Sequence, residues 1–76
     1  MTPAQCRAAR ALIGMTQPDL ARVSGLGLST IVDFEKERRF VSEASRDAIR
    51  KALEKSGVEL IPENGGGIGV RILRRK

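Results

Sequence analysis

The residues best suited to chemistry gather in one short stretch of the chain, residues 17–39. Within it, Ser29 and Asp33 are four residues apart, so a helix would place both on one face. A serine hydroxyl donates and accepts hydrogen bonds, and a carboxylate accepts them. The cations that follow are Lys36, Arg38 and Arg39. Because cations pair with phosphates, this set indicates binding to a polyanion rather than bond breaking.

The chain lacks the residues that most catalytic and metal sites need. It has no histidine, and its single cysteine, Cys6, has no partner base to activate it. One cysteine also falls short of the four N or S ligands of a structural zinc site. The glycine-rich residues 65–69 lack both the Lys-Ser/Thr pair and the following helix of phosphate-binding loops, so they predict a turn. We therefore expect no enzymatic activity, no metal and no cofactor.

Cys6 leaves two interpretations open. It could act as a redox switch or an intermolecular bridge, but free cysteine is among the most buried residue types, which favours the inner face of the first helix. No signal-peptide pattern opens the sequence, and no apolar run reaches the roughly 18 residues of a membrane span. These features predict a soluble, cytoplasmic protein that does not associate with membranes.

Size and charge narrow the class of partner. The 76 residues suffice for one small domain with a formal net charge of +5, and the isoelectric point is near 10.4. A basic surface favours polyanions. Phe34 and Phe40 are the only aromatic residues of the chain, whereas proteins that bind single strands stack bases on aromatic side chains. Double-stranded DNA is therefore the expected partner.

Capping residues divide the first 57 residues into four short helices. The expected N-terminal caps are Thr2, Thr16, Gly27 and Ser42, and the expected stop residues are Gly14, Gly25 and Gly57. Apolar residues recur at three- and four-residue spacing within each helix, which predicts one buried face per helix. The residues expected to face inward are Ala9, Leu12, Ile13, Leu20, Ala21, Leu26, Ile31, Phe34, Ala44, Ala48, Ile49, Ala52 and Leu53.

The pattern changes after residue 57. Residues 58–61 and 70–73 alternate apolar and polar side chains, and the proline, asparagine and glycines of residues 62–67 favour a turn. This pattern predicts a β-hairpin. A hairpin must pack on helices or pair with further strands to be stable. The sequence thus predicts a mainly α fold, with a four-helix domain over residues 1–57. It also predicts that residues 58–76 form the hairpin and a basic tail, Arg74-Arg75-Lys76.

A helix, a turn with glycine and a second short helix are typical of the helix-turn-helix. Thr16-Gln17-Pro18-Asp19-Leu20-Ala21, Gly25-Leu26 and Ser29-Thr30-Ile31-Val32-Asp33-Phe34-Glu35 make the chain resemble the phage-repressor and Cro-like (XRE) family over about residues 4–55. This resemblance implies a compact, lambda-repressor-like domain. It also implies a regulator of transcription, such as a repressor, that lays its recognition helix in the major groove of a specific DNA sequence.

The resemblance assigns roles to individual residues. Those expected to contact bases are Leu28, Ser29, Val32 and Asp33. Those expected to contact phosphates are Gln17, Thr30, Lys36, Arg38 and Arg39. Ser29 could bond to several bases, Asp33 could accept from cytosine N4, and an outward apolar side chain could touch a thymine methyl group. Three alternatives stay open: Gln17 as a helix cap, Asp33 in an ion pair, and the cations as a solvated surface.

Two residues depart from the family pattern. Gly27 stands where the family usually offers Ser or Thr to cap the recognition helix, and glycine is only a slightly weaker cap. Glu37 stands where glycine often ends that helix, which costs stability or changes the loop. The expected recognition face also holds few of the strongest base readers, Arg, Asn and Gln.

One such domain makes few base contacts, so we expect a homodimer on two half-sites about 34–36 Å apart. An exposed strand edge can pair with its copy, which makes the hairpin the expected contact. The residues expected there are Val58, Leu60, Ile61, Val70 and Ile72. Two other functions stay open: a protein-interaction module such as an antiactivator, using Leu28 and Val32, and an antitoxin that binds an operator and a toxin.

Overall fold

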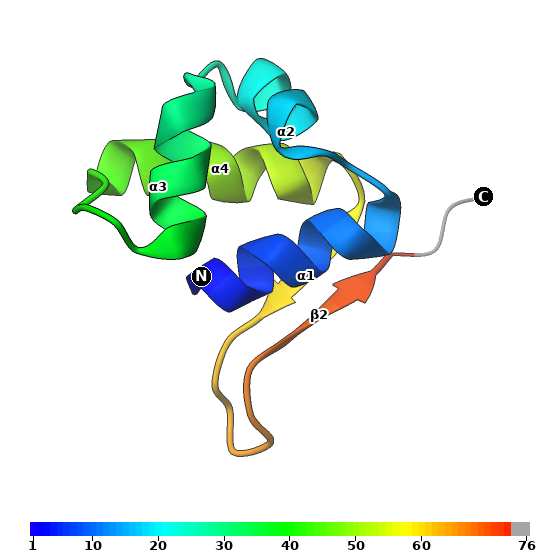
Figure 1. Cartoon of the computed structure of the whole chain (residues 1–76). Coiled ribbons are helices and arrows are strands. Elements are labelled where there is room, and N and C mark those ends of the chain that lie inside the picture. Colours follow the sequence, from blue (N-terminus) through cyan, green and yellow to red (C-terminus); the bar gives the residue numbers. More distant parts are fainter. Residues whose placement is uncertain (74–76) are drawn as a thin grey trace.

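The computed structural model describes residues 1–73, which form four helices followed by a two-stranded antiparallel sheet (Figure 1). The helices are α1 (Pro3–Ile13), α2 (Gln17–Ser24), α3 (Leu28–Lys36) and α4 (Glu43–Lys55), and the strands are β1 (Val58–Ile61) and β2 (Gly69–Ile72). The expectation of a mainly α chain with a C-terminal hairpin is confirmed. The expected basic tail, residues 74–76, lies outside the described residues.

The helices begin at the predicted caps. Thr2 and Thr16 each form a reciprocal capping box, with Gln5 and Asp19 respectively three residues later. In each box the threonine hydroxyl accepts from one backbone N–H and the longer side chain accepts from another. Ser42 caps α4 through its hydroxyl oxygen. These local bonds explain why the sequence alone locates three of the four helix starts.

Both ends of α3 lack the residue that most favours them. Gly27 caps its N-terminus without a side-chain hydrogen bond, as its lack of a side chain requires. Glu37 ends the helix with a φ of 55°, in the left-handed region that costs an L-residue about 1–2 kcal/mol. Gly25 takes the same conformation after α2 without that penalty. The stability of α3 therefore depends on its packing more than on its own sequence.

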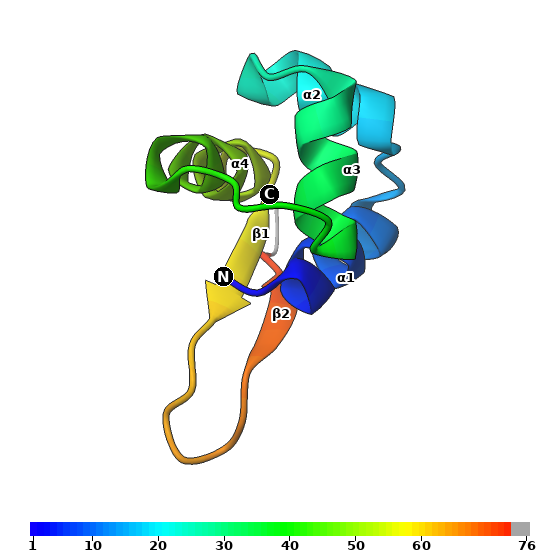
Figure 2. The same cartoon turned by 60° about the vertical axis from the view of Figure 1, so that its left-hand side comes forward.

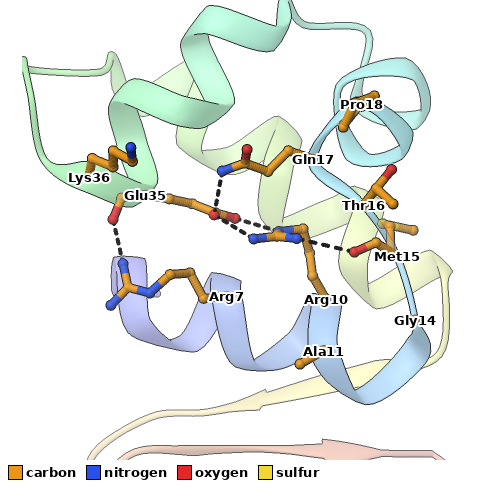
Figure 3. Close-up of a pocket in the computed structure, with 10 residues that line it drawn as sticks. All are labelled: Arg7, Arg10, Ala11, Gly14, Met15, Thr16, Gln17, Pro18, Glu35 and Lys36. Carbon is orange, nitrogen blue, oxygen red and sulfur yellow. Dashed lines mark hydrogen bonds and ion pairs between the residues drawn. The ribbon is translucent and has the colours of Figure 1, made fainter.

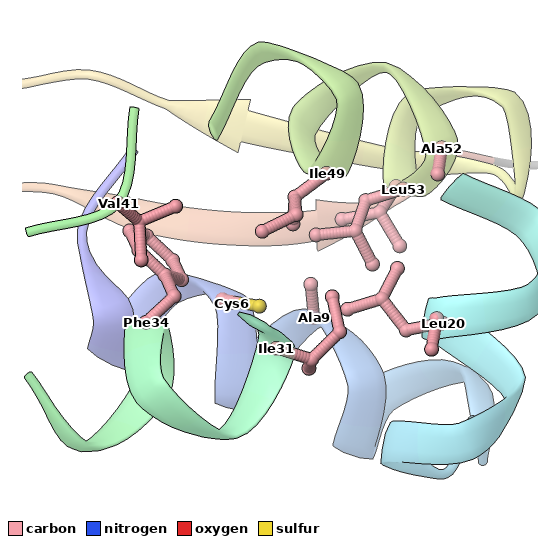
Figure 4. Close-up of a cluster of buried hydrophobic side chains, with 11 residues drawn as sticks. Cys6, Ala9, Leu20, Ile31, Phe34, Val41, Ile49, Ala52 and Leu53 are labelled. Carbon is pink, nitrogen blue, oxygen red and sulfur yellow. The ribbon is translucent and has the colours of Figure 1, made fainter. Parts of the chain in front are cut away.

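All four helices and the first strand contribute to one hydrophobic core (Figure 4). The buried residues are Cys6, Ala9, Leu20, Ala21, Ile31, Phe34, Val41, Ile49, Ala52, Leu53 and Val58. Two residues expected to face inward, Leu12 and Ala44, are exposed instead. The buried residues of α1 are Gln5, Cys6 and Ala9, so Leu12 lies outside its buried face. Ala44 is exposed because the buried residues of α4 begin at Ile49.

The hairpin packs against α1 and α4, and its turn projects away from the helices (Figure 2). Val58 enters the common core, so the helical and β parts share one core despite their different patterns. At the end where the strands part, Gln5 Nε2 donates to the carbonyl oxygens of Ile61 and Gly69, both at 2.9 Å. This bond pair ties the turn end of the hairpin to α1.

Candidate functional site

α2 and α3 are two consecutive short helices joined by residues 25–27. The backbone N–H of Leu26 donates to the carbonyl oxygen of Ala21 at 3.0 Å, and the Leu26 side chain packs against the core. Leu20 of α2 and Ile31 of α3 are both fully buried. The turn and the shared core therefore fix α3 in one orientation against α2 and α1.

One face of α3 meets the core, and the opposite face meets solvent. All four predicted base-contacting residues lie toward the solvent: Leu28 and Ser29 are exposed, and Val32 and Asp33 are half-buried. Thr30, predicted to contact a phosphate, is half-buried as well. The N-terminal half of this outward face is thus open to a partner.

The three predicted cations continue this face at its C-terminal end. Lys36 lies in the last turn of α3, and Arg38 and Arg39 lie in the loop that leads to α4. All three are exposed. Cations at a helix C-terminus also complement the helix dipole, so their position suits both the folded protein and an anionic partner.

Asp33 and Arg39 bind each other. Arg39 Nε donates to Asp33 Oδ2 at 2.8 Å, and the two side chains are 52% and 20% exposed respectively. Arg39 Nη1 also donates to the carbonyl oxygen of Phe40 at 3.2 Å. Of the two interpretations that the sequence leaves open for Asp33, this arrangement favours the ion pair over an unpaired acceptor.

The carboxylate of Glu35 lies at the centre of a buried network that joins three helices (Figure 3). Arg10 donates to it through Nε and Nη2, both at 2.7 Å. Gln17 Nε2 donates to Oε1 at 2.9 Å, and Cys6 Sγ donates to Oε2 at 3.1 Å. Arg7 donates to the backbone carbonyl oxygen of Glu35. Every acceptor site of this buried carboxylate is thereby supplied with a donor.

This network shifts the pKa values of its members. Burial by itself would raise the pKa of Glu35, but the hydrogen bonds from Arg10, Gln17 and Cys6 outweigh it and lower that pKa below its ordinary value. The hydrogen bond to Glu35 raises the pKa of Arg10. Burial, followed by the hydrogen bond to Glu35, raises the pKa of Cys6. Glu35 and Arg10 are therefore both charged, and the Cys6 thiol is kept protonated.

An open groove of about 690 Å³ lies beside this network, between α1, the start of α2 and the end of α3 (Figure 3). Its charged lining residues are Arg7, Arg10, Glu35 and Lys36. These cations outnumber the carboxylate, so the lining of the groove carries a net positive charge, and the polar residues Thr16 and Gln17 also line it. Gln17 is half-buried and its amide N–H₂ group already donates to Glu35.

Sequence reasoning did not single out Arg10 and Glu35 as partners. The sequence does indicate that Glu35 is buried, because Ile31, Phe34 and Glu35 follow the spacing of one helix face. A carboxylate among inward-facing positions needs a cation, and Arg10 lies one residue after Ala9 on the first helix. What the sequence does not contain is the distance between these two segments.

The predicted dimer residues are divided between the core and the surface. Val58 is 1% exposed, so the expectation that its side chain lies at a contact between copies is corrected: it packs inside the monomer. Leu60, Ile61 and Val70 are half-buried. Ile72 is 48% exposed and is the most accessible of the five.

Other chemistry is limited within residues 1–73. No group of three or more Cys, Asp or Glu residues is arranged to hold a metal ion there. Cys6 is fully buried with its thiol bonded to Glu35, which places it on the inner face of α1 as expected. Residues 1–73 hold no helix with the length and apolar character that a membrane crossing requires.

Comparisons with known proteins assign no family to the chain. A search with protein-family models and a search of curated proteins each found no match. The function is therefore inferred from the sequence pattern together with the geometry of residues 1–73.

Proposed function

We propose that this protein binds double-stranded DNA and regulates transcription, with α3 as a recognition helix in the major groove. The observation that carries this proposal is the division of α3 into two faces. Its inner face is held by the core, and its outward face presents Leu28, Ser29 and Val32 to solvent. A short helix braced in this way matches what docking in a major groove requires.

The distribution of charge supports the same function. Lys36, Arg38 and Arg39 are exposed at one end of the proposed reading face. In such an interface, cations neutralise phosphates and supply most of the affinity, while side chains at base edges select the sequence. Thr30 and the rim of the groove near Gln17 are further proposed phosphate contacts. The resemblance to phage-repressor and Cro-like proteins agrees with this arrangement.

Selection of bound sequences from random duplex DNA tests the proposal. We expect the wild-type chain to enrich a short motif, and the Leu28→Ala and Ser29→Ala variants to change or weaken it. Leu12→Ala is the matched control, because Leu12 on α1 is 44% exposed and Leu28 is 46% exposed. Failure of the wild-type chain to enrich any sequence would count against the proposal.

Salt dependence separates phosphate contacts from other binding. For each phosphate neutralised, the slope of log K against log salt is about −0.9. Lys36→Ala should make the slope shallower by about 1. Lys55→Ala, at the end of α4, should leave it unchanged, since both lysines are exposed but only Lys36 adjoins the proposed interface.

We further propose that the protein acts as a homodimer through the hairpin. Ile68 and Ile72, each 48% exposed, offer apolar surface beside a two-stranded sheet. Within residues 1–73 no third strand pairs with its outer edges, and such edges can pair with another chain. Deleting residues 58–76 would also remove Val58 from the core, so Ile72→Lys is the cleaner test. Sedimentation should show a dimer for the wild-type chain and a monomer for the variant; an unchanged dimer would contradict the hairpin contact.

Exposure of Leu28 favours one second candidate, a protein-interaction module such as an antiactivator or an antitoxin. A leucine that is 46% exposed beside Val32 on the outward face would also suit an apolar partner surface. Salt distinguishes the two functions, because an apolar protein interface is far less sensitive to salt than a DNA interface.

A further inference from the structure

The Asp33–Arg39 pair puts a guanidinium group on a helix face whose own sequence contains no arginine. Asp33 is four residues after Ser29 and three before Lys36, so all three lie on the outward face of α3. Arg39 reaches this face from the following loop through the 2.8 Å bond from Nε to Asp33 Oδ2. The carboxylate is the covered partner, 20% exposed, and the arginine side chain is the open one, 52% exposed.

This pairing changes what Asp33 can do next to DNA. An unpaired carboxylate on this face would be repelled by the phosphates that flank a major groove. Paired with Arg39, it is neutralised, and one of its oxygens already accepts a charge-assisted hydrogen bond. The Asp33 side chain is also the less accessible of the two, 20% exposed against 52% for Arg39. The side chain that is ready to meet a base is therefore the arginine.

We propose, on the basis of the DNA-binding function above, that Arg39 reads a guanine instead of contacting a phosphate, and that Asp33 is the positioning residue that holds it. Within residues 1–73, Arg39 spends two of its five N–H donors, one from Nε on Asp33 and one from Nη1 on Phe40. Nη2 and the second N–H of Nη1 remain. Two adjacent donors are what a bidentate contact with guanine O6 and N7 needs.

Arg38 provides a matched comparison. It is the neighbouring residue, carries the same side chain and is exposed as well, but within residues 1–73 its side chain makes no hydrogen bond or ion pair that would hold it on the face of α3. Its backbone N–H alone donates to the carbonyl oxygen of Asp33, at 3.0 Å. An arginine without a brace suits a phosphate, whose contact needs charge more than a fixed plane.

The experiment compares base preference in four proteins on the sequence selected by the wild-type chain and on its single-base-pair variants. The proteins are the wild type, Arg39→Lys, Asp33→Ala and Arg38→Lys. Lysine keeps the charge but loses the planar fork. We expect Arg39→Lys and Asp33→Ala to reduce discrimination at the same G·C pair, by about 5- to 100-fold. Arg38→Lys should leave all base preferences unchanged.

The outcomes distinguish this proposal from the function on which it rests. If the wild-type chain selects a motif but Arg39→Lys keeps every base preference, DNA binding stands and the reading role of Arg39 is overturned. Loss of preference at one pair in Asp33→Ala and at no pair in Arg39→Lys would restore Asp33 as the reader and overturn the proposal. If the wild-type chain selects nothing, both proposals fail together. A structural role alone would lower stability without changing the preferred base.

Discussion

Helix α3 carries two arginine–carboxylate pairs on opposite faces, and they differ in nearly every physical respect. The Glu35 side chain faces inward and is 1% exposed. Besides Arg10, it accepts hydrogen bonds from Cys6 of α1 and Gln17 of α2. Asp33 faces outward and is held by Arg39, which is 52% exposed. The inner pair fixes where α3 lies. The outer pair lies at the surface, where ion pairs usually contribute little to stability, and its guanidinium is accessible.

This difference follows from solvent. A buried charge that loses its partner cannot be rehydrated, whereas an exposed one can. The inner pair must therefore be complete for the fold to form, and the outer pair is available to exchange its contacts. Asp33 and Glu35 are two residues apart on one helix. Glu35 belongs to the architecture of the fold, and the role of Asp33 in binding is a proposal.

Breaking the inner pair should have the largest effect. Arg10→Met leaves the Glu35 carboxylate buried with only neutral donors, and we expect the free energy of unfolding to fall by about 3–5 kcal/mol. Urea denaturation followed by circular dichroism measures this. The control is Arg10→Met combined with Glu35→Leu, which removes both charges and should recover most of the loss. Similar stability of Arg10→Met and the wild type would show that the network is not structural.

The second-largest effect should come from acid, which should reduce the stability that the inner pair contributes. The pKa of Glu35 is lowered in the folded protein, so its contribution is present above the ordinary pKa of 4.5 and is lost as pH falls through the lower, folded pKa. We expect the stability gap between the wild type and Arg10→Met to be widest at neutral pH and to narrow below about pH 4.5. Thermal unfolding between pH 7 and pH 3 tests this; a gap that widens in acid would contradict it.

Replacing Glu37, the residue that follows α3, should have a smaller effect on stability, and in the stabilising direction. Glu37 has a φ of 55° and no hydrogen bond or ion pair from its side chain within residues 1–73. Glu37→Gly should stabilise the fold by about 0.5–1 kcal/mol, because glycine adopts this conformation without strain. Glu37→Ala, which removes the charge but keeps the Cβ atom, is the control and should give no such gain in melting temperature.

Breaking the outer pair should have the smallest effect on stability. Asp33→Ala and Arg39→Ala should each change the free energy of unfolding by about 1 kcal/mol or less, as is usual for exposed ion pairs. The same urea experiment serves as the measurement. A loss as large as that of Arg10→Met would mean that the outer pair is part of the architecture, and it would remove the contrast from which its reading role is inferred.

Local patterns predicted most of the secondary structure. Threonine and serine caps, glycine stops and turn residues affect only the backbone within a few residues of themselves. Their effects can therefore be predicted from the sequence. The exposed Leu12 shows the limit of this reasoning. Its spacing suits an apolar stripe, but the position of α1 against the other helices and the hairpin selects Gln5, Cys6 and Ala9 for burial instead.

The sequence by itself determined which segments are helix or strand, the basic charge of the chain and the mixed polar and apolar character of the outward face of α3, because these depend on neighbouring residues. Only the tertiary structure decided the partners: Glu35 with Arg10, Gln17 and Cys6, the hairpin with Gln5, and Val58 with the core. Asp33 and Arg39 are six residues apart, and even they meet only because Glu37 turns the chain back after α3. Contacts of this kind depend on how the elements pack, and the order of residues does not encode that packing locally.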